Sequence, residues 1–207
     1  YLNAVSRTIE AVSGLPLSKP VTVEGIEGFE HLAKHTTRGG VSVDGLARKT
    51  IAETLEVGRV GILVDYPQTT DAMTVAQAEA NHIHAFARLY LTESILDYSL
   101  VTIGAKQFLS RVLLSEFETV DGETVEQLRE LSLTDAGVIV SIYRQYGEEW
   151  VLVGEPISLT RSGEALDFIP FRFINPTDGR PCCVKPPMLD VATVSESHLN
   201  NSALLEW

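Results

Sequence analysis

The spacing of apolar residues predicts helices in the first third of the chain. Residues 2–13 form the first predicted helix, from apolar positions three or four residues apart, Leu2, Val5, Ile9 and Val12. Residues 43–56 form a longer one that Ser42 can cap and Gly58 can end, with an apolar stripe of Val43, Leu46, Ala47, Ile51 and Leu55. Between them, alternation over residues 19–25 predicts a short strand, and residues 26–36 predict a short helix that holds Phe29 and Leu32.

After the second long helix, alternation of apolar and polar residues predicts strands. Residues 59–65 form a buried strand bounded by Pro67, and the polar residues 67–84 form a mobile loop with a helical turn near 74–82. Later strands are expected over residues 85–91, 99–103, 107–119 and 126–134, and in a hairpin of 137–146 with 149–154 around Gly147. Residues 93–99 are predicted as a turn or short helix. Residues 157–161 and 166–174 are predicted to follow as a pair that turns at Ser162 and Gly163.

A final helix from Pro186 completes the pattern, with candidate inward positions at Leu189, Val191, Val194, His198, Leu199 and Leu205. Because helices come first and antiparallel strands follow, the expected fold class is α+β, with N-terminal helices packed on a mainly antiparallel β-rich body. Residues 1–66 would form the helical part with its short buried strand, 67–84 the polar loop, 85–185 the β-rich part of the same body, and 186–207 the start of a helix that leaves it.

Composition and charge exclude some partners. A formal net charge of −12 and a pI near 4.8 argue against a DNA-binding patch, which needs clustered Lys and Arg. No apolar run approaches the ~20 residues that span a bilayer, so no membrane partner is expected. The adjacent Cys182 and Cys183 supply too few ligands for a zinc site and are predicted to be reduced thiols.

Residues 57–67, "VGRVGILVDYP", raise the question of a catalytic carboxylate at Asp65, because many nucleotide hydrolases carry a metal-binding Asp at the end of a buried strand. A phosphate-binding loop would need G-x-x-x-x-G-K-[ST] after a strand. Lys49-Thr50 lies inside a predicted helix, and Gly104 and Lys106 lie in a predicted hairpin. We therefore predict that Asp65 bonds to turn amides.

The other candidate groups give no complete site. His31 and His35 could share a helix face and bind one metal, but no third ligand is evident, and His82, His84 and His198 stand alone. A Cys–His nucleophile would need a histidine that sequence cannot place beside Cys182 or Cys183. The acidic residues of the strand-rich part are predicted to form a solvated face, with paired carboxylates left open: Glu116, Glu118, Glu123, Glu126 and Glu130. We expect no catalytic, metal-binding or cofactor-binding residue, no cofactor and no enzymatic activity.

Aromatic residues recur through the strand-rich part, and core packing is favoured over a ligand platform. They are Phe86, Tyr90, Phe117, Tyr143, Trp150, Phe168, Phe171 and Phe173. Alternation places Phe171 and Phe173 on one face of a strand.

The order of several stretches resembles a tailed-bacteriophage family of portal proteins and portal-like proteins. The stretches are "YLNAVSRTIEAVSGLPLSKP", "DGLARKTIAETLEVGRVGILVDYP", "LYLTESILDYS", "LLSEFET", "LDFIPFRFIN" and "PPMLDVATVSESHLNNSALLEW". Each is short and apolar, so the ordered set carries the resemblance, which covers nearly the whole chain. Tyr98 departs from it, because Trp is common at that place. The family continues well past Trp207, so we expect this sequence to be part of a longer protein.

The resemblance implies a homo-oligomeric ring, usually of twelve subunits, at one corner of a phage capsid. Capsid protein, a terminase motor and head-completion proteins would be its partners, and double-stranded DNA would pass through it without sequence-specific binding. The chain would be the outer wing of a subunit, with residues 188–207 leading toward a stem. Its location would be the virion, or the bacterial cytoplasm during assembly. The alternatives are another head-tail or baseplate component, or a nucleotide- or metal-dependent hydrolase that uses Asp65.

Overall fold

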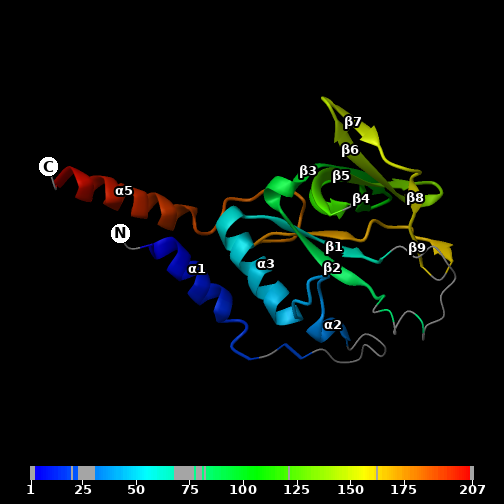
Figure 1. The fold of residues 1–207 in the computed structure, drawn as a ribbon. Coiled ribbons are helices and arrows are strands. Elements are labelled where there is room, and N and C mark those ends of the chain that lie inside the picture. The colour runs from blue at the N-terminus through cyan, green and yellow to red at the C-terminus, as the bar shows by residue number, and fades with distance from the viewer. Residues whose placement is uncertain are drawn as a thin grey trace. The chain divides into compact units, whose positions relative to one another are not determined.

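The chain folds into two compact units in a computed structural model of the protein (Figure 1). The first, called here the helical unit, consists of residues 1–89 and 171–207, and the second, the sheet unit, consists of residues 90–170. The structure describes residues 3–19, 21–22, 31–67, 77, 81, 83–120, 122–161 and 163–205. Helices and antiparallel strands are segregated along the chain, which confirms the predicted α+β class.

The helices of the helical unit begin where the sequence offers a cap. α1, Ala4–Gly14, follows Asn3, whose side-chain oxygen accepts a hydrogen bond from the Ser6 amide at 3.1 Å. α3, Val43–Val57, follows Ser42, whose hydroxyl oxygen accepts from the Gly45 amide at 3.3 Å. The others are α2, His31–Lys34, and α5, Leu189–Leu205. α1 packs against both α3 and α5. None of the helices in the described part of the chain has the length and apolar character needed to cross a bilayer.

The buried face of α3 differs from the predicted stripe. Leu46 is buried as expected, but Thr50 and Thr54 share its face, while Ile51 and Leu55 are half-buried. Each threonine hydroxyl donates a hydrogen bond to the carbonyl four residues earlier, at 2.8 and 2.6 Å. Because both hydroxyls are satisfied within the helix, their burial leaves no polar group without a partner.

Gly58 ends α3 in the left-handed conformation, as predicted, with φ at 86°. Its amide donates to the Thr54 carbonyl at 3.0 Å. A Cβ at this position would lie 2.4 Å from the carbonyl oxygen of Val184, so the absence of a side chain lets the segment before α5 approach the end of α3.

A three-stranded sheet of order β11-β1-β2 forms the other part of the helical unit. Its strands are β1, Val60–Asp65, β2, Phe86–Leu91, of which the last two residues belong to the sheet unit, and β11, Phe171–Ile174. β11 pairs antiparallel with β1, with Val60 opposite Ile174 and Leu63 opposite Phe171. The predicted pairing of 157–161 with 166–174 is therefore wrong for Phe171–Ile174. These residues pair with a strand made far earlier in the chain, and alternation within either segment does not reveal that partner.

An antiparallel meander forms the sheet unit, in the order β3-β4-β5-β6-β7. The strands are β3, Ile95–Ile103, β4, Lys106–Val120, β5, Glu123–Thr134, β6, Gly137–Tyr146, and β7, Glu149–Leu152. A 3-10 turn over Thr92–Ser94 precedes β3, so the prediction of a turn or helix over 93–99 is wrong from Ile95 onward. The core of this unit is at most 1% exposed at Val112, Leu114, Leu131 and Val138.

Short strands after β7 fold back on the meander. β8, Ile157–Ser158, pairs with β6, and β9, Thr160–Arg161, pairs with β10, Glu164–Ala165. The amide of Val138 donates to the Leu166 carbonyl at 3.0 Å, and that of Leu166 to the Leu159 carbonyl at 2.9 Å. These bonds fix the segment around residue 166 beside the start of β6.

The final helix has no buried side chain among its described residues. Leu189, Val194, His198 and Leu199, which were predicted to point inward, are exposed, and Val191 is half-buried. α5 is attached at its start instead, where the Met188 amide donates to the Leu55 carbonyl of α3 at 3.2 Å. Apolar spacing predicted the helix correctly, but the inward face was wrong, because Leu189, Val194, His198 and Leu199 are not covered by any described element of the helical unit.

Some predictions lie outside the described residues. They include Leu2, residues 26–30 of the predicted 26–36 helix, with Phe29, and most of the loop over 67–84. Within that loop, the Asn81 amide donates to the Gln77 carbonyl at 3.0 Å, the spacing of a helical turn. Val21 and Thr22, from the predicted strand over 19–25, are not in a strand.

Candidate functional site

Asp65 is the last residue of β1 and has the predicted turn role. Its carboxylate accepts a hydrogen bond from the Tyr66 amide at 2.9 Å. Lys49 and Thr50 lie inside α3, and Gly104 lies in the turn between β3 and β4 with φ at 63°. Within the described ranges, no three or more His, Cys, Asp or Glu side chains are grouped so that they could hold a metal ion.

The histidines and cysteines are dispersed. His35 and His198 are exposed, and His198 Nδ1 lies 3.1 Å from the Ser202 hydroxyl one turn further along α5. The side chain of His31 and the whole of His82 lie outside the described residues, so the structure does not test whether His31 and His35 share a helix face. Cys182 and Cys183 are free and exposed thiols.

The loop that carries these cysteines is shaped by one side chain. The Asn175 amide oxygen accepts hydrogen bonds from the Thr177, Asp178 and Gly179 amides at 2.8–3.1 Å, and its nitrogen donates to the Arg180 carbonyl at 2.9 Å. The backbone amide of Arg180, and then its guanidinium, donate to the Asp178 carboxylate and lower its pKa to about 2. The loop therefore has a defined conformation without a ligand.

Two of the predicted solvated acids are ion-paired. On one face of the meander, Glu116 accepts hydrogen bonds from Tyr90 Oη at 3.1 Å and from Arg129 Nη2 at 3.4 Å, with a closer contact from Arg129 Nε. The Glu116 side chain is 4% exposed and that of Arg129 is 16% exposed. The prediction of a solvated face is therefore wrong for Glu116, because the antiparallel register brings Arg129 beside it.

On the opposite face, a second network crosses four strands. Arg111 on β4 donates to Asp97 on β3 at 2.6 Å and to Glu130 on β5, and Tyr143 on β6 donates to Glu130 at 3.1 Å. Partial burial opposes ionisation of Glu130, but the Arg111 and Tyr143 hydrogen bonds outweigh it and lower its pKa. The hydrogen bond to Glu130 raises the pKa of Arg111, and partial burial raises that of Tyr143. The prediction of a solvated face is thus wrong for Glu130 as well.

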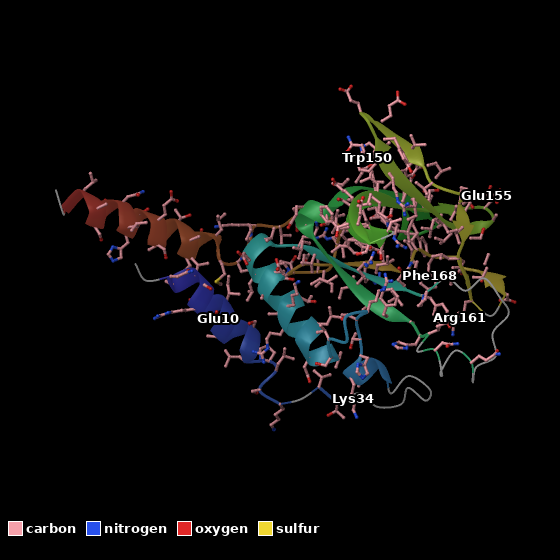
Figure 2. All side chains as sticks on the ribbon, in the orientation of Figure 1. Glu10, Lys34, Trp150, Glu155, Arg161 and Phe168 are labelled. Atoms are coloured by element: carbon pink, nitrogen blue, oxygen red, sulfur yellow. The ribbon has the colours of Figure 1, made fainter. Side chains whose placement is uncertain are left out.

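The aromatic residues divide between core and surface. Phe86, Tyr90, Phe171 and Phe173 are buried, which confirms the core prediction for them, and the rings of Phe171 and Phe173 meet edge to face at 5.0 Å. Phe117, Trp150 and Phe168 are 68%, 39% and 50% exposed, so the core prediction is wrong for these three. Figure 2 shows Trp150 on the β6–β7 hairpin.

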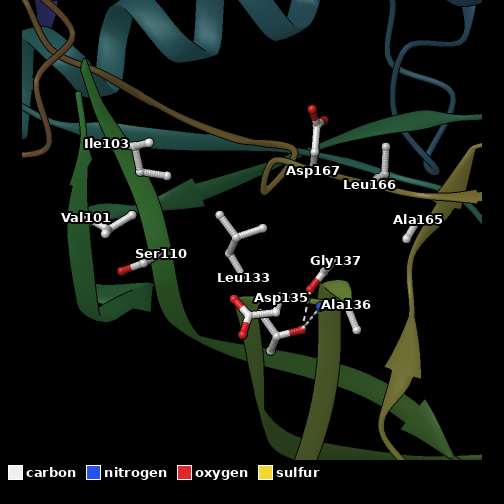
Figure 3. Close-up of a pocket in the computed structure, with 11 residues that line it drawn as sticks. Val101, Ile103, Ser110, Leu133, Asp135, Ala136, Gly137, Ala165, Leu166 and Asp167 are labelled. Atoms are coloured by element: carbon white, nitrogen blue, oxygen red, sulfur yellow. Dashed lines mark hydrogen bonds between the residues drawn. The ribbon is translucent and has the colours of Figure 1, made fainter. Parts of the chain in front are cut away.

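A hollow of about 480 Å³ lies within the sheet unit and is open to solvent, and Figure 3 shows the residues that line it. Its apolar lining includes Val101 and Ile103 from β3, Leu133 from β5 and Leu166 from the segment after β10. Two carboxylates, Asp135 in the β5–β6 turn and Asp167, belong to the same lining, which contains no Lys or Arg. Sequence reasoning missed this site, since its residues come from four separate segments.

Charge is unequally divided between the two units. Residues 90–170 contain five Lys and Arg and 14 Asp and Glu, a formal net charge of −9 out of the −12 of the chain. Of these cations, Arg111 and Arg129 are held in internal ion pairs. The surface of the sheet unit is therefore strongly acidic, which disfavours contact with nucleic-acid phosphates.

The sequence matches no protein-family model and no curated protein sequence. The ordered stretches quoted above, their folded positions and the surface chemistry of the chain are therefore the observations that bear on its function.

Proposed function

We propose that this chain is the body of a structural subunit of a tailed-phage portal, which acts by assembling into a ring rather than by catalysis. The observation that carries the proposal is the ordered set of portal-like stretches, which covers nearly the whole chain. In the ring, the subunits would form the conduit for genome packaging and ejection at the capsid vertex.

The folded positions of these stretches support the proposal. The stretch over residues 44–67 contains most of α3 and all of β1. The stretch over residues 166–175 contains β11, which pairs with β1, and the stretch over residues 186–207 contains α5, which is attached to α3 through Met188. The stretch over residues 1–20 contains α1, which packs against α3 and α5. Segments from both ends of the sequence thus form one packed unit, as expected of motifs that specify a common body.

The exposed side chains of α5 also support assembly. Leu189, Val194, Leu199 and Leu204 are 44–76% exposed on a helix that has no buried residue among those described. A helix of this kind gains stability when another subunit or a further part of the protein covers it. The acidic surface of the sheet unit suits a conduit through which DNA slides without being held.

The test is electron microscopy of the full-length protein that contains this chain. We expect closed rings with rotational symmetry, and only monomers at high protein concentration would contradict the proposal. Melting with millimolar magnesium and nucleotide tests the hydrolase alternative, because a bound ligand raises the melting temperature by mass action. We expect no shift, and a shift that Asp65→Asn abolishes would favour the hydrolase.

A further inference from the structure

We propose that the hollow of the sheet unit receives the segment after α1, residues 15–19, from a neighbouring copy of this chain. The inference rests on the proposed ring and identifies one of its subunit contacts.

The hollow has the chemistry to hold a short aliphatic segment with a cationic side chain. Its apolar lining, called here the floor, includes Val101, Ile103 and Leu133, of which Ile103 is 60% exposed, a large value for an isoleucine. Figure 3 shows Asp135 and Asp167 on either side of Leu133 in this view. Apolar side chains would bury the floor, while a cation would offset the two carboxylates.

The hollow is already formed in the single chain. The Thr134 hydroxyl accepts from the Ala136 amide at 3.2 Å and donates to the Gly137 carbonyl at 2.8 Å, which fixes the β5–β6 turn (Figure 3). Gly137 has φ at 106°, and a Cβ there would lie 2.7 Å from the Ala165 Cβ, so the turn and the opposite wall are closely packed. A preformed site binds without an ordering cost on its own side.

The segment after α1 matches this chemistry. Leu15 is 70% exposed, and Lys19 is exposed four residues later. Two turn hydrogen bonds fix the backbone between them, from the Leu17 amide to the Gly14 carbonyl at 3.2 Å and from the Ser18 amide to the Leu15 carbonyl at 3.3 Å. Just beyond, the Val21 amide donates to the Asp44 carboxylate at 2.9 Å. The segment thus offers an exposed aliphatic side chain and an exposed ammonium group on a hydrogen-bonded backbone.

The two surfaces are different parts of the chain, which determines the kind of assembly. The segment belongs to the helical unit and the hollow to the sheet unit. A contact between different surfaces of identical subunits is heterologous, and it closes into a ring when the rotation permits. In the proposed ring the occupant is the next copy, with Leu15 on the apolar floor and Lys19 between the carboxylates.

Isotope-coded cross-linking tests the contact. Full-length protein is assembled from equal amounts of unlabelled and ¹⁵N-labelled chains and treated with a carbodiimide, which joins an amine to a carboxylate in direct contact. We expect Lys19 joined to Asp135 or Asp167 in peptides of mixed isotope composition. Cross-links only between chains of the same label, or none at these residues, would overturn the contact.

Charge reversal supplies the second test. Lys19→Glu should weaken association about fivefold or more, because it replaces an ion pair by repulsion, and adding Asp135→Lys and Asp167→Lys should restore it. Lys49→Glu, on the exposed face of α3, makes the same change in charge and should alter association less than twofold. Rings that tolerate Lys19→Glu as well as Lys49→Glu would overturn the contact but leave the portal proposal standing. Absence of rings in the unmodified protein would overturn both.

Discussion

The two units specify their sheets in different ways. In the sheet unit, strands that are neighbours along β3-β4-β5-β6-β7 are also neighbours in sequence, so each tight turn sets the register of the next pair. In the helical unit, β1 pairs with β11, which the chain reaches only after it has passed through the whole sheet unit. Local turn chemistry can therefore determine the first sheet, whereas the second depends on apolar burial between distant segments.

The units also bury different groups. The core of the helical unit combines Val60, Leu63 and the Phe171–Phe173 pair with Arg59, which lies over the Phe173 ring at 5.6 Å and donates to the Pro181 carbonyl at 2.9 Å. The sheet unit buries a carboxylate, Glu116, with its own arginine. Truncation of a buried apolar side chain should therefore destabilise both units to a similar extent. Removal of one charge of the Glu116–Arg129 pair should strongly destabilise the sheet unit.

Removing a core leucine should have the largest effect and should show whether the units unfold separately. Leu63 in the helical unit and Leu114 in the sheet unit are 1% and 0% exposed, and truncation of either to alanine should cost about 2–5 kcal/mol. Hydrogen exchange should lose protection mainly in α3, β1 and β11 for Leu63→Ala and mainly in β3–β6 for Leu114→Ala. Equal losses in both units for both variants would show a single cooperative unit instead.

Breaking the buried ion pair should have the next largest effect. Glu116→Gln removes the partner charge of Arg129 and should cost about 2–3 kcal/mol, with partial exposure of Arg129 limiting the loss. Denaturant unfolding measures this cost, and Glu155→Gln on the exposed surface should stay within about 0.5 kcal/mol of the parent. The apolar pair Glu116→Leu with Arg129→Met should recover part of the loss. A double variant less stable than the single one would contradict the view that the unpaired charge is the cause.

A side chain at Gly58 should have a moderate effect in the helical unit. Gly58→Ala combines a left-handed backbone with a contact to the Val184 carbonyl and should cost about 2–3 kcal/mol. Gly104→Ala in the sheet unit has a similar φ but nothing within 4 Å of its Cβ, so backbone strain alone should cost about 1 kcal/mol. Thermal unfolding compares the two. Equal losses of stability in the two variants would mean that the segment containing Val184 moves aside without a measurable cost in free energy.

The smallest effect concerns acid stability of the sheet unit. The pKa of Glu130 is lowered in the folded chain from its ordinary value of 4.5, so its ion pair stabilises the fold above that pH. Stability should fall as the pH drops below about 4.5 and Glu130 is protonated, by less than about 1 kcal/mol for this partly exposed network. Glu130→Gln should remove this part of the pH dependence in urea unfolding at pH 3 and pH 6. An unchanged pH dependence would contradict the assignment.

Sequence reasoning found the elements better than their partners. Capping at Ser42, the glycine end of α3 and the strands of the meander followed from local chemistry, and all are present. The proximity of Glu116 and Arg129 could also have been predicted, because the two residues lie on neighbouring strands of one hairpin. The tight turn between β4 and β5 sets the register, with residue 114 opposite 129 and residue 116 opposite 127, so Arg129 lies one diagonal step from Glu116. The β1–β11 pairing and the hollow could not be predicted from the sequence, because each joins segments whose proximity is set only by the folded core.

The β1–β11 pairing has a consequence for how the protein is made. β1 leaves the ribosome early, but Phe171–Ile174 follows only after residues 90–170 have been synthesised. At the usual rate of about 5–20 residues per second, the apolar edge of β1 waits several seconds for its partner. The meander, whose contacts are local, has ample time to form during that interval. We therefore expect the sheet unit to fold first during translation, with nascent β1 as a binding site for chaperones until Phe171–Ile174 emerges.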